Sequence, residues 1–252
     1  MPSTLGPAIR IGAPLLALAA LAACSVVPVP PSALPEQWAP SITPSALPSD
    51  DVDSPLGFDA EQRSAVRIRN VACDGLSTGS GFILDDHTIV TNHHVVEPAG
   101  QLEVTLSDGT DVAVESSRYA KNADFALITT VESLHPPATL SPNNATTGDS
   151  VTVVGYPNGE QLVVSHGSIT TLDYDTLDNA PFVFITTAYA THGSSGSAVY
   201  NDAGDVIGVL YAGDDETGET AVIPVSLLSE FLNADVLQVE NAVACTPDIL
   251  KP

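Results

Sequence analysis

The sequence predicts an all-β fold made of two six-stranded antiparallel β-barrels with one short helix near the C-terminus. Short alternating apolar runs are separated by turn residues, and only one segment of the domain has helical spacing. Such a pattern is typical of barrels or a sandwich. A segment rich in Pro, Asn and Thr, residues 134–149, divides the strands into two comparable sets, which favours two barrels.

The expected strands fall on both sides of this segment. The pairs Asp108-Gly109 and Asn158-Gly159 each lie between two apolar runs, which predicts two hairpins. Residues 225–232 have helical spacing, with Leu227, Leu228, Phe231 and Leu232 on one side. The strands are expected at residues 65–69, 79–84, 87–91, 102–106, 112–114, 125–131, 151–154, 161–164, 182–186, 198–200 and 206–211.

The folded domain is expected to span residues 60–236, with barrels at about 62–135 and 146–233. A tail, residues 237–252, follows it. Residues 24–59 are dominated by Pro, Ser and Ala and show no hydrophobic periodicity, which predicts an extended tether rather than a folded unit.

Residues 1–23 have the features of an export signal. Arg10 supplies a positive charge, and the apolar run 11–23 is shorter than the roughly 18 residues that span a bilayer. Leu21-Ala22-Ala23-Cys24 resembles the bacterial lipoprotein signal, which implies that Cys24 becomes the lipid-bearing first residue. Ordinary secretory cleavage is the alternative. We therefore expect an extracytoplasmic protein, lipid-anchored to the bacterial cell membrane.

Charge and cysteine content agree with export. The net charge is −24, from 31 acidic and 7 basic residues, which argues against nucleic acid and against electrostatic docking on anionic lipid. High solubility outside the cell is the simpler meaning. Disulfides persist in exported proteins, so Cys73 and Cys245 either form a disulfide, the preferred interpretation, or stay as two thiols.

The chemistry of the chain centres on Gly193-Ser194-Ser195-Gly196-Ser197, which precedes an apolar run. This pattern predicts a serine presented on a tight turn that leads into a buried strand. A serine hydroxyl is a weak nucleophile until a base takes its proton. Thr91-Asn92-His93-His94-Val95-Val96 offers a histidine, and Asp124 is the only charge in its apolar segment.

Together with Gly79-Ser80-Gly81-Phe82-Ile83, these motifs resemble those of trypsin-like serine peptidases of the chymotrypsin clan. The resemblance covers roughly residues 62–233 and is strongest to the bacterial HtrA-like and glutamyl-endopeptidase-like branches, without a PDZ domain. It implies a chymotrypsin-like fold, with Ser195 as nucleophile, His94 as general base and Asp124 holding the imidazole. In the family motif the catalytic histidine directly precedes the apolar pair, which selects His94 over His93.

The resemblance also implies the remaining parts of the site. The N–H groups of Gly193 and Ser195 would hold the developing oxyanion. Tyr189 stands where trypsin-type enzymes carry an aspartate, and residues 208–211 lack the histidine of glutamyl endopeptidases, so we expect a pocket for small or medium apolar side chains. Ser194 stands where animal digestive proteases carry an aspartate that forms a salt bridge with a newly cut N-terminus. Activation through that salt bridge is therefore not expected. The implied pocket residues are Tyr189, Ala190, His192, Tyr211 and Gly213.

The predicted function is that of a serine endopeptidase acting on a protein or peptide, without a cofactor and as a monomer. No metal site is predicted, because the chain has neither His-x-x-x-His nor Cys-x-x-Cys spacing. The main alternative is a catalytically silent surface protein of the same fold that binds peptides or envelope components. A structural envelope lipoprotein and an α/β-hydrolase esterase are weaker alternatives, since an esterase needs the order Ser, acid, His.

Overall fold

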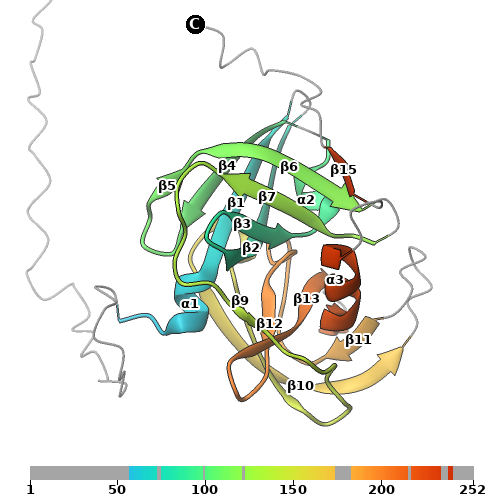
Figure 1. Ribbon diagram of the computed structural model, residues 1–252. Coiled ribbons are helices and arrows are strands. Elements are labelled where there is room, and N and C mark those ends of the chain that lie inside the picture. The colour runs from blue at the N-terminus through green and yellow to red at the C-terminus, as the bar shows by residue number, and fades with distance from the viewer. Residues whose placement is uncertain are drawn as a thin grey trace, which may run out of the picture. The chain divides into compact units, whose positions relative to one another are not determined.

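Two curled β-sheets, one from each half of the domain, form the computed structural model of this chain (Figure 1). The structure describes residues 57–72, 75–98, 100–120, 123–173, 183–214 and 217–233, and the backbone alone of 238–240. The predictions for the signal 1–23, for Cys24, for the Cys73–Cys245 disulfide and for most of the tether and tail therefore lie outside the described residues.

Within these residues the first sheet has eight strands, and all of its neighbouring strands pair antiparallel. Their order is β15-β6-β7-β3-β2-β1-β4-β5. The strands are β1 (Ala65–Val71), β2 (Leu76–Asp85), β3 (Thr88–Thr91), β4 (Gln101–Leu106), β5 (Asp111–Val112), β6 (Val114–Ala120), β7 (Ala126–Thr130) and β15 (Gln238–Glu240).

The second sheet has seven described strands in the order β12-β9-β10-β11-β14-β13-β8, and a further β12–β13 pairing closes it into a ring. Only the short β8–β13 pair is parallel. The strands are β8 (Thr139–Leu140), β9 (Ser150–Gly155), β10 (Val163–Asp173), β11 (Val183–Thr186), β12 (Ala198–Tyr200), β13 (Asp205–Gly213) and β14 (Thr220–Pro224).

The predicted fold class is confirmed, with additions. Without β5, β8 and β15, which are two or three residues long, each sheet has the six strands expected. Both predicted hairpins are present, because β4 pairs with β5 around Gly109 and β9 pairs with β10 around the Asn158-Gly159 turn. The strand expected at 112–114 covers β5 and only the first residue of β6, so most of β6 was not predicted. The strands β8, β14 and β15 and the N-terminal helix α1 (Ala60–Ser64), capped by Asp59, were not predicted either.

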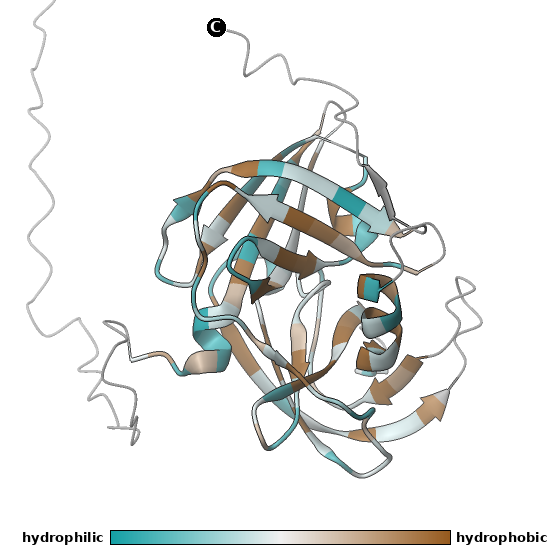
Figure 2. Ribbon diagram, viewed as in Figure 1, coloured by the Kyte–Doolittle hydropathy of each residue, from teal (hydrophilic) through white to brown (hydrophobic). Residues whose placement is uncertain are grey.

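Three apolar clusters explain why the central strands are almost continuously hydrophobic. Side chains alternate between the two faces of a strand, and here both faces are buried. In β3, Ile89 belongs to the interior of the first barrel, whereas Val90 belongs to a cluster shared by both barrels. In β12, Val199 faces the interior of the second barrel and Tyr200 the shared cluster. Figure 2 shows apolar residues recurring along strands of both sheets.

The predicted C-terminal helix is α3 (Val225–Asn233), which packs beside β13 and β14 (Figure 1). Its Phe231 stacks on Phe125 of the first barrel, with ring centroids 5.7 Å apart. Both rings belong to the shared cluster, and Phe125 directly follows Asp124 in the chain. No helix in the described ranges is long and apolar enough to cross a bilayer.

We predict that Phe231→Ala lowers the free energy of unfolding by about 3–5 kcal/mol, because it removes a buried ring from the shared cluster. Val131 is 61% exposed, so Val131→Ala should change that free energy by less than about 0.5 kcal/mol. Urea denaturation of both variants measures the difference. Equal midpoints for the two would contradict the packing described for α3.

Candidate active site

Ser195 lies on a turn that both barrels hold in place. Gly196, with φ +88°, donates its N–H to the Leu210 carbonyl at 2.9 Å, which ties the turn to β13. On the other side, the N–H of Ser80 in β2 donates to the Ser195 carbonyl at 2.8 Å. A positive φ suits glycine, which has no Cβ to oppose it. The nucleophile candidate is thus fixed between strands of the two halves.

Ser80 is the residue that sequence analysis named only as part of a motif and whose role it missed. It is fully buried, and its Oγ donates to the Gly193 carbonyl at 2.7 Å and accepts the N–H of Tyr156 at 2.8 Å. Thr91, at the end of β3, donates its hydroxyl to the Ser80 carbonyl at 2.7 Å. One serine of the Gly-Ser-Gly motif therefore links the turn of Ser195 to both barrels.

The helix α2 (His93–Val96) carries His94 and places it against Asp124. Nδ1 of His94 lies 2.6 Å from Oδ2 of Asp124, and the His94 backbone N–H donates to Oδ1 at 3.0 Å. The side chain of Asp124 is 18% exposed and that of His94 47%. The carboxylate therefore fixes both the ring and the backbone of His94.

The carbonyl of Asp124 is also held, because it accepts from the Asn92 side chain at 2.9 Å and from the His93 N–H at 3.2 Å. Val95 and Val96 anchor the helix in the interior of the first barrel. Gly79 lets this helix approach β2, since a Cβ there would lie 2.5 Å from a Val95 methyl group.

The two adjacent histidines have different surroundings. The ring of His93 stacks on Tyr119 at a centroid distance of 3.8 Å, and its Nε2 lies 3.3 Å from a carboxylate oxygen of Glu97. Its ring makes no hydrogen bond to the Asp124 carboxylate, which His94 occupies. The geometry thus pairs His94, and not His93, with the Asp124 carboxylate.

Two backbone N–H groups beside the serine are unused. Within the described ranges, neither the Gly193 nor the Ser195 N–H has a hydrogen-bond acceptor. The His192 carbonyl, which belongs to the same peptide as the Gly193 N–H, accepts from the Asn158 N–H at 2.6 Å. This contact fixes the orientation of the peptide, so the Asn158-Gly159 turn positions one candidate oxyanion donor.

Sequence analysis predicted this turn only as a hairpin signal. Asn158 has φ +56°, and Gly159 has φ +68°. The pair Asn-Gly is favoured where consecutive residues take positive φ. Glu160 N–H closes the turn on the Pro157 carbonyl at 3.1 Å. The signal therefore predicted the right backbone but not its contact with His192.

The hydroxyl of Ser195 donates to the Tyr211 carbonyl at 3.4 Å, and within the described residues no hydrogen bond joins it to His94. Tyr211 also approaches the histidine, because its ring centroid lies 6.2 Å from that of His94 in an edge-to-face arrangement. Tyr211 thus contacts both the serine and the histidine. Hydrogen bonds between catalytic groups are often long without substrate.

The residues expected to wall a primary pocket come from residues 189–192 and from β13. Ala190 is buried, and a Cβ at Gly213 would lie 2.8 Å from the Ala190 carbonyl oxygen, so these two backbones are in close contact. His192 is exposed and Tyr211 half-buried. Tyr189 is 61% exposed, so its ring lies at the surface. Among the described residues no cluster of three or more metal-ligating side chains occurs.

Comparison with known proteins identifies related sequences. Residues 79–209 match the family described as a trypsin-like peptidase domain. A glutamyl endopeptidase of Staphylococcus epidermidis is 27% identical over 183 residues, which cover 64% of this chain and 64% of that protein. A probable periplasmic serine endoprotease, DegP-like, of Chlamydia trachomatis is 35% identical over 153 residues, covering 59% of this chain and 29% of that protein. The chain thus spans less than two thirds of both relatives.

Among solved structures, the active form of the Rv3671c protease from M. tuberculosis has the same fold. The TM-score is 0.64 at 24% identity, covering 69% of this chain and 81% of that one. At this identity the similarity shows the fold, which is the chymotrypsin-like pair of barrels.

We predict that a proton NMR spectrum contains a far-downfield resonance from the hydrogen between His94 Nδ1 and Asp124 Oδ2, because the contact is short and charge-assisted. Asp124→Ala should remove the signal. His93→Gln should retain it, since the His93 ring does not contact the Asp124 carboxylate. A signal lost in His93→Gln and kept in Asp124→Ala would show that the proton does not lie between His94 and Asp124, which would contradict the pairing.

Proposed function

Because this chain belongs to the trypsin-like peptidase family, we propose that it is a serine endopeptidase that hydrolyses peptide bonds through an acyl-enzyme on Ser195. One observation carries the proposal: the 2.6 Å contact between His94 and Asp124 lies beside a serine turn whose two N–H groups are unused. The motifs in the order His, Asp, Ser support the same roles.

In the proposed reaction, the Ser195 side chain first rotates from the Tyr211 carbonyl toward Nε2 of His94. Oγ then bonds to the substrate carbonyl carbon while Nε2 takes the hydroxyl proton. As the C–N bond breaks, His94 passes this proton to the departing amine. Water next attacks the acyl-enzyme, His94 takes its proton, and Ser195 recovers that proton when the acid leaves.

Asp124 acts by holding His94 in one tautomer. A proton on Nδ1 that is donated to Oδ2 leaves Nε2 without a proton, so that Nε2 can accept one from Ser195. The fixed negative charge also stabilises the imidazolium that forms when Nε2 takes the proton. The backbone bond to Oδ1 keeps the carboxylate in one orientation while this happens.

The negative charge of the tetrahedral intermediate would be held by the Gly193 and Ser195 N–H groups. Neither N–H group has an acceptor among the described residues, which supports this role. Gly193 has φ +86°, and a Cβ there would lie 2.7 Å from the Asn158 nitrogen, so only glycine fits the turn. The contact between Asn158 and His192 keeps the competing His192 carbonyl away from the oxyanion site.

For the primary pocket we retain the assignment of Tyr189, Ala190, His192, Tyr211 and Gly213, with a preference for small or medium apolar side chains. The exposed ring of Tyr189 supports a shallow pocket whose rim it forms. Glutamyl specificity belongs to the Staphylococcus relative by name. It is not carried over, because β13 lacks a histidine at residues 208–211.

We also propose that the enzyme works outside the cytoplasm, held at the outer face of the cell membrane by a lipid on Cys24. The sequence of residues 1–24 supports export and lipidation, and the Chlamydia relative is named as periplasmic. A monomer, the Cys73–Cys245 disulfide and a protein or peptide substrate remain part of this proposal.

A catalytically silent, peptide-binding surface protein is the second candidate. The specific observation in its favour is the bond from Ser195 Oγ to the Tyr211 carbonyl, which turns the hydroxyl away from its base. The two candidates differ in whether the serine reacts, so one chemical probe separates them.

We predict that a fluorophosphonate adds once to the protein, at Ser195, because the base and the oxyanion donors are assembled around it. Intact-mass measurement should show one adduct on the parent and none on Ser195→Ala, and peptide turnover should fall about 10⁶-fold in that variant. Ser194→Ala serves as the matched control and should still be labelled. Folded protein without an adduct would favour the silent binding protein.

A second prediction concerns the anchor. In a bacterial host that processes lipoproteins, the full chain should incorporate labelled fatty acid and partition into the membrane fraction. Cys24→Ser should lose both properties, because the thiol is the only group in that segment that can form the thioether to lipid. A full-length chain that is exported but unlabelled would support ordinary secretory cleavage instead.

A further inference from the structure

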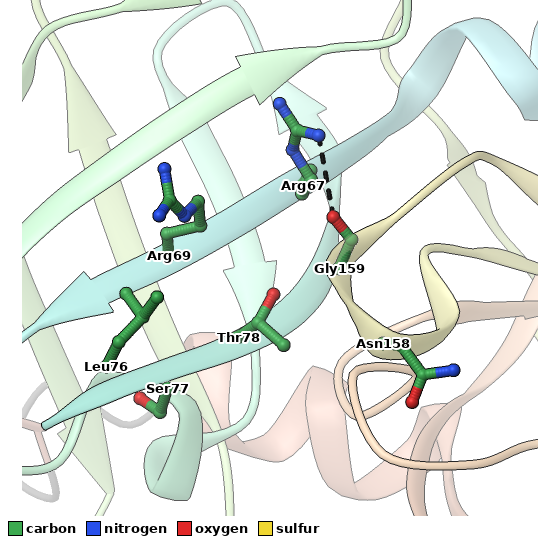
Figure 3. A pocket seen from close by; sticks show the side chains of 7 residues that line it. All are labelled: Arg67, Arg69, Leu76, Ser77, Thr78, Asn158 and Gly159. Atoms are coloured by element: carbon green, nitrogen blue, oxygen red, sulfur yellow. Dashed lines mark hydrogen bonds between the residues drawn. The ribbon is translucent and has the colours of Figure 1, made fainter. Parts of the chain in front are cut away.

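A hollow of about 340 Å³ opens beside the Asn158-Gly159 turn, where the turn faces β1 and β2 (Figure 3). Arg67 and Arg69 of β1 line it, two residues apart and therefore on the same face of the strand. Thr78 of β2 lines it as well. None of these side chains has a part in the reaction proposed above.

The two arginines are unexpected in a chain with this charge. Only 7 of its residues are Lys or Arg, against 31 that are acidic, and yet two arginines share one hollow. An acidic protein repels anionic ligands in general. The electrostatic potential at this hollow is therefore opposite in sign to that of the protein as a whole.

The guanidinium group of Arg67 makes only weak hydrogen bonds. Its terminal nitrogens donate to the Gly159 carbonyl at 3.5 Å and to the Thr105 hydroxyl at 3.4 Å, both at the long limit for hydrogen bonds. Its Nε is buried and has no acceptor among the described residues. An under-bonded guanidinium is costly to bury, and a planar carboxylate is the acceptor whose shape it matches.

Arg69 has a partner that it can exchange. It pairs with Glu103 at 3.2 Å, but the two side chains are 45% and 42% exposed. Exposed ion pairs contribute little to stability, so a competing carboxylate can take the place of Glu103 at small cost. Arg69 therefore adds positive charge to the hollow without being committed to the fold.

The hollow is linked to Ser195 through β2 and through the Asn158-Gly159 turn. Thr78 is two residues before Ser80, whose N–H donates to the Ser195 carbonyl. Gly159 is joined to the same centre through Asn158, which donates to His192. A strand advances about 3.3 Å per residue, so the hollow begins about two residues of extended peptide from Ser195. The proposed primary pocket lies instead between residues 189–192 and β13.

We propose that this hollow binds a carboxylate on the leaving-group half of the substrate, at the second residue after the cleaved bond. The inference rests on the proposed function. The acyl half of the substrate occupies the primary pocket, so the departing half extends over β2 toward Arg67 and Arg69. Charge-assisted, bidentate hydrogen bonds from a guanidinium then select Asp, Glu or a terminal carboxylate there.

Two carboxylates of the protein limit the preference of the hollow for an anionic substrate residue, because they lie close to the same arginines. Glu103 already pairs with Arg69, and Glu160 lines a neighbouring hollow of about 540 Å³ that also contains Arg67. Glu160 is exposed and makes no contact with Arg67 within 4 Å among the described ion pairs. Removing the charge of Glu160 should strengthen the binding of an anionic substrate residue. A Glu160 variant is therefore expected to gain affinity, whereas the arginine variants lose it.

The test uses matched peptides that share one acyl half, chosen from a first cleavage profile, and differ only after the cleaved bond. The leaving halves are Ala-Glu-Ala-amide, Ala-Gln-Ala-amide and Ala-Ala with a free terminal carboxylate. Fluorophosphonate titration counts competent sites in each preparation, and kcat and KM are expressed per competent site. The amide and free-acid peptides separate a side-chain carboxylate from a terminal one.

We expect the Glu peptide to exceed the Gln peptide about tenfold in kcat/KM, mainly through KM. Arg67→Gln should bring the ratio of the two kcat/KM values to about one. Arg69→Gln should lower the ratio, and Glu160→Gln should raise it. Arg118→Gln changes an exposed arginine on β6, away from the hollow, and should keep the parental ratio. The ratio should also fall as salt is raised, because exposed charges are screened.

Equal rates for Glu and Gln peptides on titratable enzyme would overturn this inference alone. The same holds if the ratio survives Arg67→Gln in folded, titratable protein. If Arg67→Gln does not fold, an unchanged ratio in both Arg69→Gln and Glu160→Gln overturns it. An absence of titratable sites in the parent protein would instead overturn the proposed function on which the inference rests.

Discussion

The hydrogen bond from the Ser80 N–H to the Ser195 carbonyl is the contact on which the site depends. It crosses from the first barrel to the turn that carries the nucleophile candidate, while His94 and Asp124 belong to the first barrel alone. The bond thereby ties the turn of the serine directly to the barrel that carries its proposed base. The Ser80 hydroxyl adds two more contacts, to Gly193 and Tyr156, so one buried residue sets the position of the turn.

Packing makes this contact rigid. The cluster shared by both barrels contains Phe82 of β2, close to Ser80 in sequence, and Ala198 of β12, close to Ser195. Each of these strands also contributes side chains to the interior of its own barrel. A shift of one barrel against the other would therefore open a buried apolar cluster as well as break hydrogen bonds. Close-packed interiors resist such shifts, which suits a site that needs fixed geometry.

The sequence predicted most strands and the motifs, because alternation and turn pairs such as Asn158-Gly159 are local signals. The strands β6, β8 and β14 were missed. The segment of β6 is mostly polar, β8 is two residues long and pairs far along the chain with β13, and the hairpin of β13 with β14 has no Asn-Gly or Asp-Gly turn pair. The pairing of His94 with Asp124 followed from the motif. The contacts of Ser80, the clamp on His192 by Asn158 and the hollow around Arg67 join segments far apart in sequence, so no local pattern could have indicated them.

The most direct measurement is a crystal structure of the protein after reaction with a fluorophosphonate. If the site works as proposed, the phosphorus is bonded to Ser195 Oγ and the phosphonyl oxygen lies about 2.7–3.1 Å from both the Gly193 and Ser195 nitrogens. His94 stays paired with Asp124 in that structure. A phosphonyl oxygen in solvent, with the His192–Gly193 peptide turned so that its carbonyl points into the oxyanion site and its N–H points away, would contradict the proposed oxyanion site and the mechanism built on it.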